Sequence, residues 1–78
     1  MSKFPKDAPK DKVLKALNKL GFIVVREGNH ISLQRKELDG SSTPMTIPNH
    51  RTYRSSTLRI AIAQAGIKRE EFIKVYYK

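Results

Sequence analysis

The chain has 78 residues, 38% of them hydrophobic, so a single domain spanning residues 1–78 with one modest core is expected. Sixteen lysines and arginines outnumber seven acidic residues, and the formal net charge of +9 favours a polyanionic partner such as nucleic acid. The chain has no cysteine, no apolar run of membrane-spanning length and no secretory signal, which excludes disulfide chemistry and indicates a cytoplasmic location. The two histidines and the carboxylates are not clustered at ligand spacing, so no metal or other cofactor is expected.

The N-terminal part predicts a flexible leader over residues 1–8 and then an amphipathic helix from Pro9 to Leu20, capped by Asp7. The apolar stripe of this helix consists of Val13, Leu14, Leu17 and Leu20. A row of lysines occupies another face: Lys12, Lys15 and Lys19. This row either is simply solvated or contacts phosphates. Gly21 is placed to end the helix in a left-handed conformation.

Three antiparallel strands are expected next. FIVVRE (22–27) and HISLQRK (30–36) are β-rich stretches, and Gly28-Asn29 between them predicts a two-residue turn of type II′ or I′. Asp39-Gly40 marks the following turn. PMTIP (44–48) is then a short third strand, which its prolines restrict to an edge of the sheet.

The remaining sequence predicts two helices. Ser55 or Ser56 is expected to cap the first, and Gly66 to end it. Its core-facing residues are Leu58, Ala61, Ile62 and Ala65. REEFIKVYY forms a short last helix that packs Phe72 and Ile73 on the core. The fold class is therefore α+β with the order α-β-β-β-α, a three-stranded antiparallel sheet and a short C-terminal helix.

The turn between the first two strands determines where His30 points. A two-residue turn sets Glu27 opposite His30. Alternation then places Phe22, Val24, Ile31 and Leu33 on the core face, and Ile23, Val25, Glu27, His30, Ser32 and Gln34 on the open face. An exposed imidazole beside a carboxylate suits general acid/base chemistry near neutral pH. The alternative is a surface histidine without a role.

Three stretches together, LKALNKLGFIVVREGNHISLQ, MTIPNH and STLRIAIAQAGIKREEF, resemble the HicA-type mRNA interferase toxins over about Val13 to Phe72. The resemblance implies a double-stranded-RNA-binding-domain-like fold and metal-independent cleavage of RNA. It assigns the essential histidine to His30, in the Gly28-Asn29-His30 turn. It also implies a HicB-type antitoxin that binds the toxin and blocks its active face.

The hypothesis is therefore an endoribonuclease toxin of a type II toxin–antitoxin system, with His30 as catalytic residue and Glu27, Asn29 and Gly28 in support. Candidate RNA-binding residues are Lys12, Lys15, Lys19, Arg26, Arg51, Arg54 and Arg59. A non-catalytic RNA-binding module of the same fold is the alternative.

Two questions stay open in the sequence. His50 is either a plain loop residue or a second phosphate or partner contact, and Tyr53 either stacks a base or fills a gap. Ile23 and Val25 would make the open face apolar, and an antitoxin or substrate bases would cover them. Otherwise the loop 36–44 or the C-terminal tail folds over them.

Overall fold

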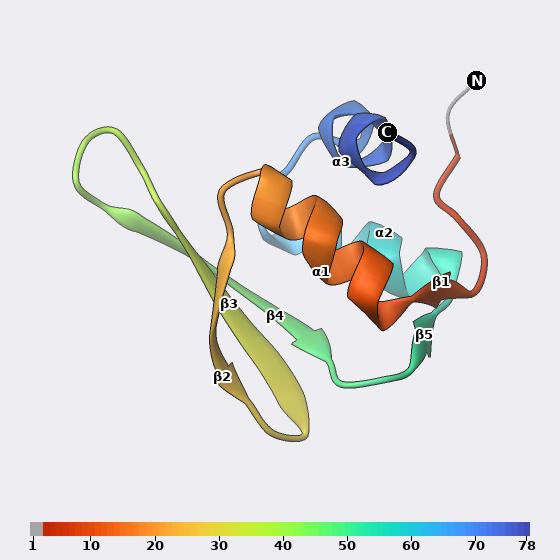
Figure 1. Cartoon of the computed structure of the whole chain (residues 1–78). Coiled ribbons are helices and arrows are strands. Elements are labelled where there is room, and N and C mark those ends of the chain that lie inside the picture. Colours follow the sequence, from red (N-terminus) through yellow and green to blue (C-terminus); the bar gives the residue numbers. More distant parts are fainter. Residues whose placement is uncertain (1–2) are drawn as a thin grey trace.

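The computed structural model describes residues 3–78 (Figure 1). Its elements are, in chain order, β1 (Ala8–Pro9), α1 (Lys10–Lys19), β2 (Ile23–Glu27), β3 (His30–Lys36), β4 (Ser42–Pro48), β5 (Thr52–Tyr53), α2 (Ser55–Gln64) and α3 (Arg69–Tyr76). The α+β class, the α-β-β-β-α order and the short C-terminal helix are confirmed. The two-residue strands β1 and β5 were not predicted. No helix among the described residues is long and apolar enough to cross a membrane.

The main sheet is antiparallel with the strand order β2-β3-β4, so β4 lies at an edge, as its prolines predicted. Figure 1 shows α1, α2 and α3 on the same side of this sheet. The inner side of the sheet contributes buried Ile31, Leu33, Met45 and Ile47 to the core, together with Phe22 just before β2. The helices bury their apolar side chains against this surface, with Val13, Ala16, Leu17, Leu58, Ala61, Ile62, Phe72 and Ile73 among them.

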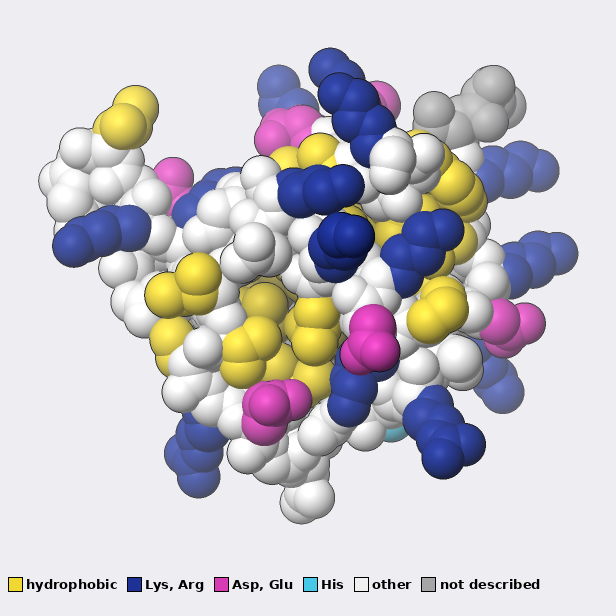
Figure 2. Space-filling model, in the orientation of Figure 1, with side chains coloured by type: hydrophobic (Ala, Val, Ile, Leu, Met, Phe, Trp, Pro, Cys, Tyr) yellow, Lys and Arg dark blue, Asp and Glu magenta, His cyan; other side chains and the backbone are white. Residues whose placement is uncertain are grey.

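The edge strand β2 is poorly covered. Val24 was expected in the core, but 41% of it is exposed because it lies on the edge strand. Ile23 and Val25 are 58% and 53% exposed. The space-filling view shows hydrophobic side chains at the surface over β2, and Lys and Arg side chains gathered over α1 and α3 (Figure 2).

The first residues of the chain pack on the core. β1 pairs with β5, with Ala8 opposite Tyr53, and Ala8 is fully buried. Phe4 is also buried, and its ring centroid lies 6.0 Å from that of Phe72. The expectation of a loose leader over residues 1–8 is therefore wrong for residues 3–8, because its apolar side chains are needed to close the core beside α3. Residues 1–2 lie outside the described residues.

The helix ends follow the predicted glycines, but the caps at the starts do not follow the predicted side chains. Gly21 has φ of 99°, and the amide of Phe22 donates to the carbonyl of Leu17 at 3.0 Å, which is a Schellman ending. Asp7 does not cap α1, since the N-cap residue is Pro9. The first residue of α2 is Ser55 and its N-cap is Arg54, because only one residue separates the helix from Tyr53, the buried residue of β5. No side chain caps either helix start.

Candidate active site

The turn between β2 and β3 differs from the prediction. Ile23 pairs with Gln34 and Val24 with Leu33, as expected, but the register shifts after Val24 and then sets Arg26 opposite Ser32 and Glu27 opposite Ile31. The prediction of Glu27 opposite His30 is therefore wrong. Turns of type II′ and I′ need a positive φ at their first central residue. Gly28 is not among the positive-φ glycines of residues 3–78, so the turn is not of either type. The last pair of the two strands is Glu27 with Ile31, and three residues lie between them. The additional residue of β2 is accommodated by a bulge at Val25.

The bulge changes which side chains share the face of His30. Directly paired residues point to the same side of a sheet, so Glu27 lies on the side of Ile31, and Arg26 lies with Ser32 and His30. His30 itself is exposed and alternates with the buried Ile31, so its predicted place on the open face is confirmed. Arg26 is diagonal to His30, about 7–8 Å away between α-carbons and within reach of a long side chain. The charged residue of β2 on the face of His30 is thus Arg26, in a diagonal position, and not a carboxylate directly opposite the imidazole.

Asn49 ties the turn to the rest of the protein. Its side-chain Nδ2 donates to the carbonyl of Gly28 at 2.8 Å, and its backbone amide donates to the carbonyl of Asn29 at 3.1 Å. The Nζ of Lys10 donates to Oδ1 of Asn49 at 3.1 Å. Because His30 pairs with Pro48, the turn, the residues after β4 and the first residue of α1 meet at one place. The turn also has one hydrogen bond of its own, from the amide of Gly28 to the carbonyl of His30 at 3.0 Å, and the contacts of Asn49 add a tie from outside it.

Sequence reasoning missed Asn49 and Lys10 as site residues. Asn49 could have been found from the β3–β4 hairpin. If the two strands are paired residue by residue starting from the Asp39-Gly40 turn, residues 48–49 come to lie beside His30. Lys10 carried no such signal, since its contact joins residues 39 positions apart in the chain.

His50 and Tyr53 lie next to this place with different exposures. Tyr53 is buried, and its hydroxyl donates to the carbonyl of Pro48 at 2.6 Å. Burial raises the pKa of the Tyr53 phenol. Tyr53 therefore fills the core and does not stack a base. His50 is exposed, and its ring is stacked against that of Tyr53 with centroids 6.0 Å apart.

The predicted arginines do not form one cluster. Arg51 lies near the turn: its carbonyl accepts from the amide of Lys10 at 2.9 Å, and the two residues line a shallow hollow with Pro9. Arg54 lines another hollow with Lys6 at the start of α2. Arg59 lines a third, of about 320 Å³, whose other basic residues are Lys3, Lys6 and Arg69. Of the predicted basic residues, the structure thus brings Arg26 and Arg51 near the turn.

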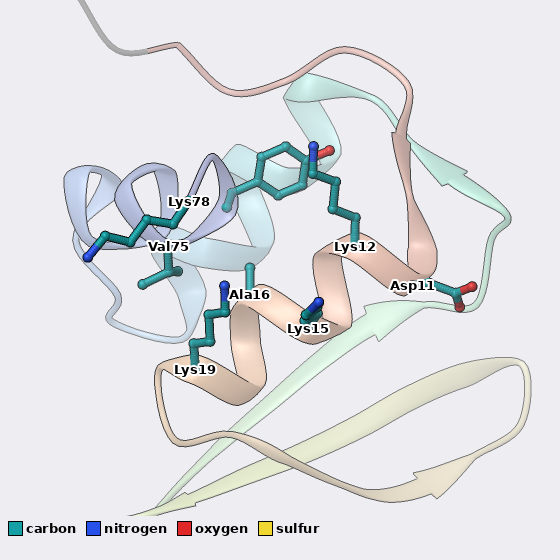
Figure 3. A pocket seen from close by; sticks show the side chains of 8 residues that line it. Asp11, Lys12, Lys15, Ala16, Lys19, Val75 and Lys78 are labelled. Carbon is teal, nitrogen blue, oxygen red and sulfur yellow. The ribbon is translucent and has the colours of Figure 1, made fainter.

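The predicted lysine row lies elsewhere. Lys12, Lys15 and Lys19 line a groove of about 370 Å³ between α1 and the C-terminal part of α3. Figure 3 shows the three side chains along the length of α1, with Lys78 across from them. No residue of the Gly28–His30 turn lines this groove. The row is therefore a second basic region, separate from His30.

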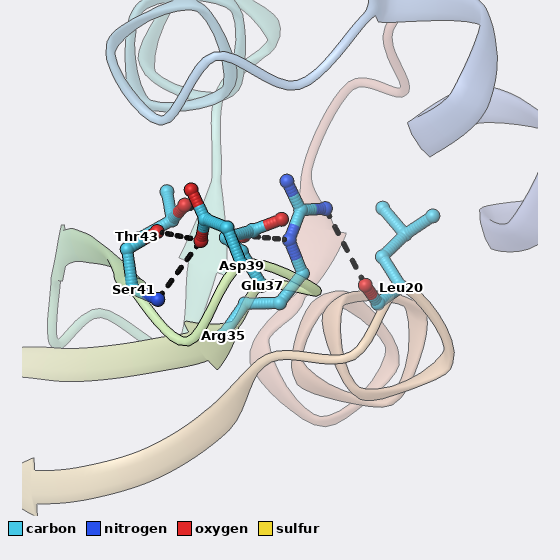
Figure 4. Close-up of polar contacts among 6 residues, drawn as sticks. All are labelled: Leu20, Arg35, Glu37, Asp39, Ser41 and Thr43. Atoms are coloured by element: carbon cyan, nitrogen blue, oxygen red, sulfur yellow. Dashed lines mark hydrogen bonds and ion pairs between the residues drawn. The ribbon is translucent and has the colours of Figure 1, made fainter.

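The β3–β4 hairpin extends beyond β2, and polar contacts hold it together close to its loop (Figure 4). The Nε of Arg35 donates to Oε2 of Glu37 at 2.8 Å, and the hydroxyl of Thr43 donates to the same oxygen at 2.6 Å. The bond from Thr43, followed by the bond from Arg35, lowers the pKa of Glu37. The guanidinium of Arg35 also lies 4.7 Å from the ring centroid of Phe22.

Leu38, at the tip of this hairpin, is fully exposed. The hairpin therefore does not fold over Ile23 and Val25, and those two side chains stay more than half exposed with the C-terminal tail in place. Both alternative covers considered from the sequence are wrong, since the paired hairpin strands point away from the body of the protein (Figure 1).

Comparison with known families identifies the chain. The family model described as the HicA toxin of bacterial toxin–antitoxin systems matches residues 11–67 of the 78. The chain belongs to the HicA toxin family. Membership makes this HicA-family protein the toxin component of a toxin–antitoxin system and implies an antitoxin partner. The matched span contains His30 and Asn49, whereas α3 lies outside it. No curated protein and no solved structure matched the chain.

Proposed function

We propose that this HicA toxin is a metal-independent endoribonuclease that cleaves mRNA, with His30 as its general acid/base. The observation that carries the proposal is an exposed imidazole on a turn that Asn49 ties to the start of α1. A proton-transfer catalyst needs both access to substrate and a fixed orientation. Family membership supports a toxic activity, and the excess of positive charge suits an RNA substrate.

In the proposed reaction, the imidazole of His30 takes the proton of a ribose 2′-hydroxyl while the 2′-oxygen attacks the adjacent phosphorus. The bond from phosphorus to the 5′-oxygen of the next nucleotide breaks, and the imidazolium returns the proton to that oxygen. The products are a 2′,3′-cyclic phosphate and a free 5′-hydroxyl. Arg26, diagonal to His30, and Arg51, beside the turn, are the candidates to stabilise the extra negative charge at phosphorus.

The direct test is RNA degradation by toxin freed from its antitoxin, in buffer containing a chelator. We expect cleavage that leaves 2′,3′-cyclic phosphate ends, and no cleavage of DNA, which has no 2′-hydroxyl. A substrate with one 2′-deoxyribose at a mapped cleavage site should resist at that site alone. Salt-sensitive RNA binding without any cleavage would instead establish the non-catalytic RNA-binding module and overturn the enzyme.

RNA binding should depend steeply on salt. Each phosphate neutralised by lysine or arginine releases counterions, so log Kobs should fall linearly with log salt, with a slope of about −0.7 per neutralised phosphate for single strands. Titration of the non-cleaving His30→Ala protein with labelled RNA, from low to physiological salt, measures this slope. An affinity that stayed flat across this range would remove nucleic acid as the substrate.

The antitoxin, which we propose to be of the HicB type, should cover His30 together with Ile23 and Val25. The two aliphatic side chains are more than half exposed on an edge strand, and interfaces exclude water from apolar surface of this kind. Hydrogen exchange of the complex should therefore show protection of the β2 amides relative to the free toxin. Protection confined to the lysine row of α1 would contradict this mode of inhibition.

A further inference from the structure

The groove between α1 and α3 concentrates positive charge that the fold does not use. Four lysines line it, namely Lys12, Lys15, Lys19 and Lys78, and Asp11 is the one acidic side chain among its lining residues (Figure 3). The one ion pair among residues 3–78 joins Arg35 and Glu37, so none of these ammonium groups is paired with a carboxylate. Uncompensated like charges side by side repel one another, and a bound polyanion removes that repulsion.

Aromatic rings lie beside these lysines. The Nζ of Lys12 is 4.7 Å from the ring centroid of Tyr76, which fixes one ammonium at the rim of the groove. Tyr76 is buried, and that burial, with a smaller contribution from Tyr77, raises the pKa of its phenol, which stays uncharged. Tyr77 is 59% exposed, and its ring meets that of Tyr76 edge-on at 5.0 Å. Tyr77 does not line the groove itself, but its exposed ring lies beside it, with its centroid 5.9 Å from the Nζ of Lys12.

We propose that this groove binds a single-stranded segment of the RNA substrate, with one base stacked on Tyr77 and successive phosphates along Lys12, Lys15 and Lys19. A positively charged track with an exposed aromatic ring is how proteins hold unpaired strands, since every base has a face to stack. The bases of a duplex are already stacked and present no free face. From Lys12 to Lys19 the helix rises by seven steps, or about 10 Å, which suits a few nucleotides.

This inference rests on the proposed ribonuclease function and adds a substrate class to it. Tyr77 and the groove residues Val75, Tyr76 and Lys78 lie outside residues 11–67, so the site is not carried over from the family match. The groove is separate from the His30 turn, so one part of the protein holds the strand and another part cleaves it.

The test uses full-length protein with His30→Ala, so that RNA stays intact, and an unstructured RNA of about ten nucleotides, within the usual site sizes. Tyr77→Leu should weaken binding by roughly 5- to 150-fold, the worth of one stacked base, whereas Tyr77→Phe should keep it. Lys15→Ala with Lys19→Ala should reduce the salt slope by about 0.7 for each phosphate that is no longer neutralised. A duplex of the same sequence should bind more weakly and be insensitive to Tyr77→Leu.

Lys36→Ala with Lys68→Ala is the matched control, since both lysines are exposed and neither lines the groove. Equal weakening by the control pair, or an unchanged affinity for Tyr77→Leu, would overturn the groove as the site. Groove substitutions that leave RNA affinity intact but weaken the antitoxin complex would overturn it in favour of a protein partner. In each of these cases the protein with His30 intact would still cleave RNA. If the proposed function were wrong, the protein with His30 intact would not cleave RNA either, so the two failures are distinguishable.

Discussion

His30→Ala is expected to abolish RNA cleavage and spare the fold. A positioned general acid/base contributes about 10²–10⁴-fold to rate, and a single imidazole that both takes and returns the proton should account for at least this much. The side chain is exposed on the outer side of β3, so the free energy of unfolding should change by less than about 0.5 kcal/mol. RNA affinity should fall far less than rate, because the basic side chains that bind phosphates are unchanged. Single-turnover cleavage, denaturant unfolding and RNA titration measure the three quantities.

His50→Ala is the matched control for this prediction. Both histidines are exposed, but the ring of His50 stacks against buried Tyr53, and it lies outside the turn that Asn49 holds. Its loss should therefore be the milder change in rate. Full activity in His30→Ala would end the proposed mechanism, and an unfolded His30→Ala protein would show that the side chain serves the structure instead.

Asn49→Ala is expected to lower the cleavage rate by up to about 10²-fold, the effect of a small misplacement of a catalytic group. The substitution removes the bond from Nδ2 to the carbonyl of Gly28 and the bond from Lys10 to Oδ1. The turn then lacks both an internal type II′ or I′ geometry and its side-chain tie, so His30 samples more orientations. Stability should drop by about 1–3 kcal/mol, since each of the two lost hydrogen bonds has a net worth of about 0.5–1.5 kcal/mol. Rate at saturating RNA should fall while RNA affinity stays within a few-fold.

Asn18→Ala is the control for removing an amide side chain, since Asn18 makes only a long bond of 3.4 Å to the carbonyl of Phe22, at the far end of α1. It should leave the cleavage rate unchanged. Lys10→Met removes the other half of the tie and should reproduce part of the Asn49→Ala loss. Wild-type rates in both Asn49→Ala and Lys10→Met would show that the turn positions His30 without these contacts.

Local sequence signals predicted much of this structure. Gly21 and Gly66 end their helices at positive φ, since only a residue without a side chain adopts that conformation at little cost. The prolines of β4 correctly restricted that strand to an edge. Alternation along β3 correctly separated the buried Ile31 and Leu33 from the exposed His30. Each of these features is decided by a residue and its immediate neighbours.

Contacts between distant segments could not be predicted in this way. The packing of Phe4 against Phe72 joins the two ends of the chain, and the clamp of Asn49 joins three separate segments. The Val25 bulge was not predicted either. Two residues between the strands suggested a two-residue turn, but the structure has a three-residue connection, bonded within itself from Gly28 to His30 and tied to Asn49.

The sequence by itself determined the kinds and ends of the main elements, the exposure of His30 and the family, because these depend on local conformational preference, period-two alternation and motif spacing. Only the tertiary structure decided which side chains surround His30. It placed Arg26 on the face of His30, moved Glu27 to the other face, tied the turn to Lys10 through Asn49, and separated the lysine row from the turn. The physical reason is that a one-residue shift in register moves side chains to the opposite face of a sheet, and that the contacts at the turn come from Asn49, about twenty positions along the chain.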